Sequence, residues 1–204
     1  MMIFFPVKQV IRDNRNWIMM AFTIFIVSAF AFYLTTSLAP AEVDQAAGTP
    51  LEELLGFVSL LMETEPFISA LLIFMNNFIS MAQMLILGVV AGISPLFTLG
   101  VNGALIGVML SVTVQEGVPL LPIVLYGILP HGIFELSAFF LCGAIGLKFG
   151  YHCIASPLPG KNRMQSFRYI WKEAISIIPI VVGLLLAAAF IEMLITPHLI
   201  VRVL

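Results

Sequence analysis

Long runs of apolar residues, separated by short polar stretches, make up most of the chain. The runs cover about residues 17–38, 67–91, 96–114, 119–150 and 174–196. Each is at least as long as the roughly 18 apolar residues that identify a membrane-spanning helix. The pattern therefore predicts an all-α polytopic integral membrane protein, with five spans in one transmembrane helical domain that occupies residues 1–204.

The first run has a rival interpretation as a secretory signal peptide, because Ala39-Pro40-Ala41 resembles a small-residue cleavage site. The apolar part of a signal peptide is about 7–15 residues long, and the run over residues 17–38 is longer than that. We therefore expect this segment to be retained as the first transmembrane helix.

The fourth run is too long for one straight crossing. A helix over residues 118–150 would extend about 50 Å, whereas the hydrocarbon core of a bilayer is about 30 Å thick. The run is also too short for two full crossings. Pro130, followed by Gly132, marks a natural break. We expect a half-helix or re-entrant segment over about 119–129, and then a longer helix that begins at His131.

The composition supports a membrane protein and excludes other classes. Hydrophobic residues account for 61% of the chain and charged residues for 10%, with a mean hydropathy of +1.10. A soluble domain usually contains about 25% charged residues. The sequence has neither a phosphate-binding glycine loop before a lysine nor the basic and aromatic pattern of a nucleic-acid binder. Cys142 and Cys153 indicate neither a disulfide framework nor a metal cage.

The charges between the runs predict the orientation of the chain. Residues 40–65 contain six acidic residues and no lysine or arginine, whereas residues 148–172 contain five basic residues and three more precede the first run. The positive-inside rule then places the amino terminus in the cytoplasm and the carboxyl terminus outside it. We expect a multi-pass protein of the cytoplasmic (inner) membrane, with residues 40–65 as an extracytoplasmic acidic loop.

This outer loop contains the signals of a short helix. Thr49-Pro50-Leu51-Glu52 combines a capping-box pattern with proline at the first helical position, and apolar residues follow at helical spacing. An amphipathic helix is therefore expected along the outer membrane interface or folded onto the bundle. It would either cover apolar surface or bind a partner protein.

Polar residues lie inside the apolar runs, where hydrocarbon offers no water to solvate them. His131 and Glu135 are four residues apart, so their side chains meet on one helix face, and we expect them to form a hydrogen-bonded pair. Side chains from three other spans are expected to converge on this pair. The predicted intramembrane cluster consists of Asn76, Asn77, Asn102, His131, Glu135 and Glu192.

Glycine pairs four residues apart indicate close helix packing. Such pairs let helix backbones approach where burial of apolar surface gives no drive toward association. They predict a compact bundle, and a homo-oligomer is a further expectation. The pairs are Gly88 with Gly92, Gly103 with Gly107, and Gly146 with Gly150.

Several of these residues stand in motifs that resemble those of the stage II sporulation protein M family. The resemblance covers nearly the full chain, including the five-span layout and the acidic outer loop. Its most specific part is the proline-histidine-glycine-x-x-glutamate element, and Ser137 departs from the proline found in much of that branch. The matching motifs are Asn76-Asn77, Pro130-His131-Gly132-Ile133-Phe134-Glu135 with Ala138, and Ile191-Glu192 with Thr196-Pro197.

The resemblance implies a membrane-embedded organiser. Family members in endospore formers act with a pair of lytic hydrolases at the septum during engulfment of the forespore. The wider family also occurs in archaea and in bacteria that make no spores, so engulfment does not follow for this chain.

Three interpretations of the polar cluster stay open. It is an interhelical lock, a site for transport of protons, ions or small solutes, or the centre of a metal-dependent intramembrane hydrolase. The hydrolase would use His131, Glu135 and Glu192 with a water as metal ligands. It ranks last, because the sequence has no His-Glu-x-x-His helix.

We therefore expect a non-enzymatic organiser that recruits or stabilises partner proteins at the membrane, with a small-solute or ion transporter as the alternative. No catalytic residues, cofactor or firm metal site are predicted. The expected partners are membrane lipids, membrane or envelope proteins and a second copy of the chain, and nucleic acid is excluded.

Overall fold

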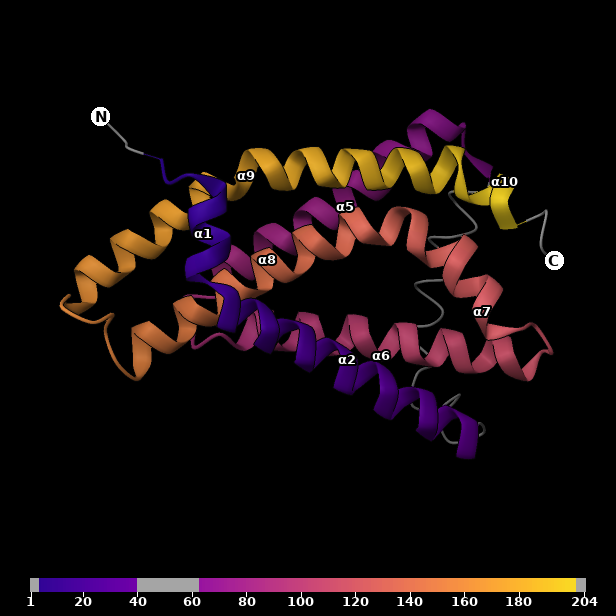
Figure 1. Cartoon of the computed structure of the whole chain (residues 1–204), viewed down its shortest axis with the longest axis horizontal. Helices are drawn as coiled ribbons and strands as arrows, with labels where there is room; N and C mark the ends of the chain where they lie inside the picture. The colour runs from indigo at the N-terminus through magenta and orange to yellow at the C-terminus, as the bar shows by residue number, and fades with distance from the viewer. Residues whose placement is uncertain (1–3, 40–62, 201–204) are drawn as a thin grey trace.

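The computed structural model describes residues 4–39 and 63–200 as a bundle of long helices (Figure 1). The predicted amphipathic helix and nearly all of the acidic loop lie outside these residues. The helices are α1 (Val7–Asp13), α2 (Arg15–Leu38), α5 (Pro66–Leu87), α6 (Ile93–Gln115), α7 (Leu120–Pro122), the π-helix η1 (Ile123–Ile128), α8 (Leu129–Ile154), α9 (Arg163–Leu194) and α10 (Thr196–Ile200).

Five helical segments within the described residues are long and apolar enough to cross a membrane, which confirms the all-α polytopic prediction. Consecutive segments run in opposite directions along the bundle, and α1 and α10 lie at its opposite ends (Figure 1). This arrangement is what an odd number of crossings requires. The segments are Arg15–Leu38, Pro66–Leu87, Ile93–Gln115, Leu120–Ile154 and Arg163–Leu194.

The fourth span changes helix type and bends where a break was predicted, but it stays helical throughout (Figure 1). Residues Ile123–Ile128 form a π-helix, and α8 begins at Leu129 rather than at His131. Pro130 has no N–H group for an α-helical hydrogen bond to the preceding turn. The wider π-helical turn lies directly ahead of this missing bond. Single π-turns inside α-helices occur often at functional sites.

Helix α8 is the centre of the bundle. It contacts α2, α5, α6 and α9, and every residue over 141–150 is buried. Glycines let the backbones of neighbouring elements approach α8 closely. A Cβ added at Gly88, directly after α5, would lie 2.7 Å from the Cα of Gly146, and a Cβ at Gly150 would overlap the backbone at Gly92. These glycines therefore bring backbones of one chain into contact.

Glycines also shape the turn between α5 and α6 and the contact between α2 and α6. Gly92 adopts φ of 68°, a left-handed conformation that favours glycine, and it directly precedes α6. A Cβ at Gly103 or at Gly107 would overlap backbone carbonyls of α2, those of Phe25 and Ala29. The small residues of α6 thus allow α2 to lie closely against it.

The basic segment over residues 148–172, between the last two predicted runs, is mostly helical, because α8 continues to Ile154. Helix α9 begins at Arg163, well before the predicted start at residue 174, so the connection itself covers only residues 155–162. A capping box starts α9: Asn162 Oδ1 accepts from Gln165 N at 2.8 Å, and Gln165 Oε1 accepts from Asn162 N at 3.0 Å. Pro179 lies inside α9, which bends part-way along (Figure 1).

Candidate functional site

A histidine and two glutamates meet where the start of α8 faces the end of α9. Helix α8 carries His131 and Glu135, and α9 carries Glu192 near its C-terminal end. One ring nitrogen of the histidine and one carboxylate oxygen of each glutamate all lie within 4.8 Å of one another. The three side chains are half-buried. They face one another inside the bundle instead of spreading around its perimeter.

Two hydrogen-bonding residues from neighbouring elements border this group. The side chain of Asn77, on α5, hydrogen-bonds the carboxyl group of Glu135. Thr196 Oγ1 lies 3.5 Å from His131 Nδ1 and donates to the Ile191 carbonyl at 3.2 Å. Thr196 opens α10, which contacts η1 and α9. The site is thus assembled from α5, α8, α9 and α10.

The prediction that His131 and Glu135 form a hydrogen bond with each other was wrong. In the described part of the chain, His131 contacts Thr196 and Glu135 contacts Asn77. The ion pairs of this part are Arg12 with Asp13 and Lys148 with Glu173, so neither Glu135 nor Glu192 has a basic partner there. Protonation of the carboxyl groups, a proton on His131 or a bound cation is therefore needed to balance them, because an uncompensated charge in this setting is costly.

Two predicted members of the cluster lie elsewhere. Asn76 is exposed on the outside of α5, whereas its neighbour Asn77 reaches Glu135. Asn102 is half-buried, and its Nδ2 donates to the Thr98 carbonyl of its own helix at 2.9 Å. The structure therefore brings Asn77, His131, Glu135 and Glu192 together and leaves Asn76 and Asn102 apart.

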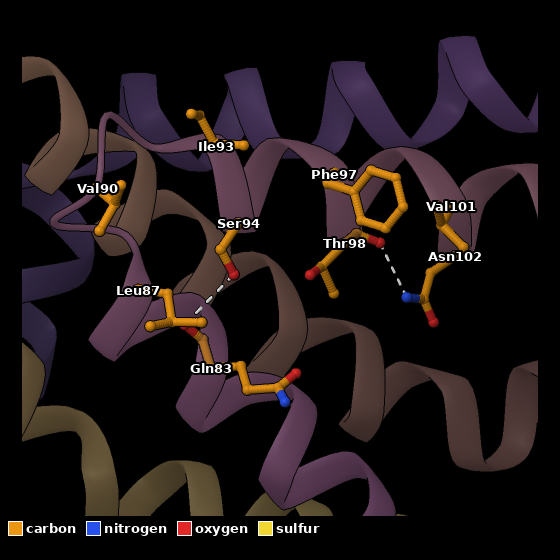
Figure 2. Close-up of a pocket in the computed structure, with 9 residues that line it drawn as sticks. All are labelled: Gln83, Leu87, Val90, Ile93, Ser94, Phe97, Thr98, Val101 and Asn102. Carbon is orange, nitrogen blue, oxygen red and sulfur yellow. Dashed lines mark hydrogen bonds between the residues drawn. The ribbon is translucent and has the colours of Figure 1, made fainter.

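Asn102 instead lines a groove between α5 and α6, beside the turn that joins them (Figure 2). The groove has a volume of about 540 Å³ and is open to the outside of the bundle. Gln83 and Asn102 direct their amides toward the space between the two helices (Figure 2). The groove is lined by Gln83, Leu87, Val90, Ile93, Ser94, Phe97, Thr98, Val101 and Asn102.

A second buried polar group was missed by the sequence reasoning. Lys148 Nζ donates to Glu173 Oε2 at 2.7 Å and to Asn14 Oδ1 at 2.9 Å. Lys148 was assigned to the basic cytoplasmic segment, because a lysine near the end of an apolar run usually lies at the membrane interface. The sequence offered one signal of its burial, because apolar residues flank Lys148 on each side.

Comparison with known proteins identifies the family. The family model described as stage II sporulation protein M matches residues 19–197. The chain belongs to the stage II sporulation protein M family. Asn77, His131, Glu135 and Glu192 all lie inside the part that matches the stage II sporulation protein M model.

One relative from this comparison is an uncharacterized protein of the archaeon Methanocaldococcus jannaschii. It is 33% identical over 124 residues, which are 61% of this chain and 68% of the relative. No solved structure matches the chain at a comparable level of significance. The comparisons therefore show a stage II sporulation protein M family member and carry no assigned activity with them.

Proposed function

We propose that this member of the stage II sporulation protein M family is a non-enzymatic membrane organiser, and that it binds a transmembrane helix of a partner protein between α5 and α6. The observation that carries the proposal is the open groove with polar side chains on its walls. These side chains, Gln83, Ser94, Thr98 and Asn102, lie in spans that hydrocarbon is expected to surround.

Hydrogen bonding is the first reason for a protein partner. Gln83 is exposed, and its side-chain amide makes no hydrogen bond among the described residues. The amide of Asn102 bonds only within its own helix there. Lipid tails offer such amides no partner, whereas a second helix with serine, threonine, asparagine or glutamine does. A bond of this kind contributes about 0.6 kcal/mol on average, so several together favour association.

The shape of the groove is the second reason. Large apolar side chains stand on its rim, among them Phe97, which is 70% exposed, and Ile93, which is 61% exposed. Helices in a membrane associate largely through van der Waals packing, and a mostly apolar groove with a few polar groups on its walls accepts a helix with a small or polar face. Recruitment through such a contact needs no catalytic residue and no domain outside the membrane.

A photo-crosslinker at the rim tests the proposal. Benzoylphenylalanine replaces Phe97 in one variant and Phe30, which is 62% exposed on α2 and away from the groove, in the control. In native membranes we expect a protein adduct from position 97 that disappears when Gln83→Leu and Asn102→Leu are added. Adducts with lipid alone, or a protein adduct that survives both leucines, would contradict partner binding in this groove.

Transport of an ion or small solute is a second candidate, favoured by one specific observation. Ionisable side chains lie directly after the π-helix and Pro130 in the fourth span, and irregular helices beside ionisable residues recur in transporters. Flux across proteoliposomes that is lost in Glu135→Gln and in Glu192→Gln would support transport. Absence of flux through the unaltered protein would eliminate it.

A further inference from the structure

We propose that His131, Glu135 and Glu192 bind one divalent transition-metal ion, of the class represented by zinc. The proposal is independent of partner binding in the groove, because the two sites share no residue. It concerns occupancy of a site and does not require that the ion crosses the membrane.

The positions of the three side chains are the first argument. His131 and Glu135 are four residues apart on one face of α8, and Glu192 approaches from α9. Two ligands at this spacing on a helix can reach the same ion. Their ligand atoms already lie within 4.8 Å of one another, and a tetrahedral zinc ion with bonds of about 2.0–2.1 Å needs separations of roughly 3.4 Å. Small side-chain rotations therefore suffice to close the site.

Charge is the second argument. Glu135 and Glu192 place two carboxyl groups side by side, with no lysine or arginine partner in the described part of the chain. A divalent cation would neutralise both carboxylates at once. Glu173 is the internal contrast, since Lys148 neutralises that buried carboxylate directly.

The chemistry of the donors selects the class of ion. An imidazole nitrogen with two carboxylate oxygens suits zinc and related transition metals, whereas magnesium and calcium prefer all-oxygen sites. Three protein ligands leave a fourth position of a tetrahedral ion for water or another ligand.

Hydrogen bonds behind the ligands are the third argument. Asn77 hydrogen-bonds Glu135 and so restricts the orientation of its carboxyl group. Because the Thr196 hydroxyl donates to the Ile191 carbonyl, its oxygen is left to accept from His131 Nδ1, at 3.5 Å. A proton on Nδ1 leaves Nε2 free to bind a metal. Such supporting hydrogen bonds are a regular feature of metal sites.

Metal binding to the purified full-length protein in detergent tests the proposal. The protein is stripped with a chelator and titrated with cobalt, whose visible absorption reports its ligands, and zinc is counted by elemental analysis. We expect one ion per chain, and at least tenfold weaker binding in His131→Ala and in Glu192→Gln. His152→Ala is the matched control, because His152 lies at the other end of α8 and bonds the Ser156 carbonyl.

Two outcomes would overturn the proposal. One is that the unaltered protein binds neither zinc nor cobalt, which would leave a shared proton to balance the two carboxyl groups. The other is that binding persists at full affinity in His131→Ala and Glu192→Gln. X-ray absorption of the zinc-loaded unaltered protein gives a readout that does not depend on variants folding: we expect one imidazole nitrogen among oxygen ligands, and any sulfur ligand would contradict the site.

Discussion

Lys148 Nζ lies 2.7 Å from Glu173 Oε2, and the two side chains are only 6% and 2% exposed. Asn14, between α1 and α2, completes a ring: it accepts from Lys148 at 2.9 Å and donates to Glu173 Oε1 at 3.0 Å. The ring joins the first, fourth and fifth spans at the end of the bundle where α1 lies. The histidine and glutamate site lies at the opposite end, beside α10 (Figure 1).

Breaking this ring on one side should destabilise the protein more than removing its charges together. We expect Lys148→Met to lower the free energy of unfolding by about 3–5 kcal/mol, because it leaves the buried Glu173 carboxylate without its partner. Lys148→Met combined with Glu173→Leu should recover part of that loss. Thermal unfolding in detergent measures both variants. Equal melting temperatures for the single and the double variant would contradict the explanation.

The close approach of α5 and α8 predicts a second stability effect. A Cβ at Gly146 would overlap the Met84 carbonyl and press on Pro95, so Gly146→Ala should cost about 1–3 kcal/mol through overpacking. Gly183→Ala on α9 is the control, because nothing lies within 4 Å of the added Cβ. Its melting temperature should stay the same or rise slightly. A similar loss in both variants would mean that this close approach does not limit stability.

Neighbouring asparagines provide a matched pair for the candidate metal site. Asn77 bonds Glu135, whereas Asn76 is exposed. We expect Asn77→Leu to weaken cobalt binding about 10-fold to 100-fold, as loss of a supporting hydrogen bond does in metal sites. Asn76→Leu should leave the affinity unchanged. The two titrations are run side by side, and equal affinities for these variants would show that Asn77 does not position the carboxyl group.

Orientation is tested by the reactivity of single cysteines. After Cys142→Ala and Cys153→Ser, one new cysteine is placed at Glu116 or at Lys161, both of which are exposed between spans. With the amino terminus inside, a membrane-impermeant maleimide should label Glu116→Cys in intact cells and Lys161→Cys only after lysis. The reverse pattern would invert the topology that the positive-inside rule predicts.

The polar cluster shows how far sequence reasoning reaches. The motif around His131 and Glu135 and the single carboxylate of Glu192 marked three residues that do meet. Asn76 and Asn77 could not be told apart, because consecutive residues point about 100° apart around a helix and the rotation of that helix is set by its neighbours. Asn102 bonds its own helix, which no spacing rule excludes.

The ends of the spans were predictable only roughly, for a related reason. Apolar runs indicated five crossings, but α9 begins at Arg163 because the capping box at Asn162 extends it through basic residues. Lys148 looked like an interfacial charge and is buried, because Glu173 and Asn14 arrive from other helices to pair with it. Local composition contains no information about partners that are distant in sequence.

The sequence by itself determined that this protein is a bundle of membrane-spanning helices, since the cost of placing polar groups in hydrocarbon depends on residue type and run length alone. It also determined where small residues let backbones touch. The tertiary structure alone decided which polar side chains face each other, which lie in an open groove and which charge is buried with a partner. Those outcomes depend on how each helix is rotated about its axis, and packing between helices sets that rotation.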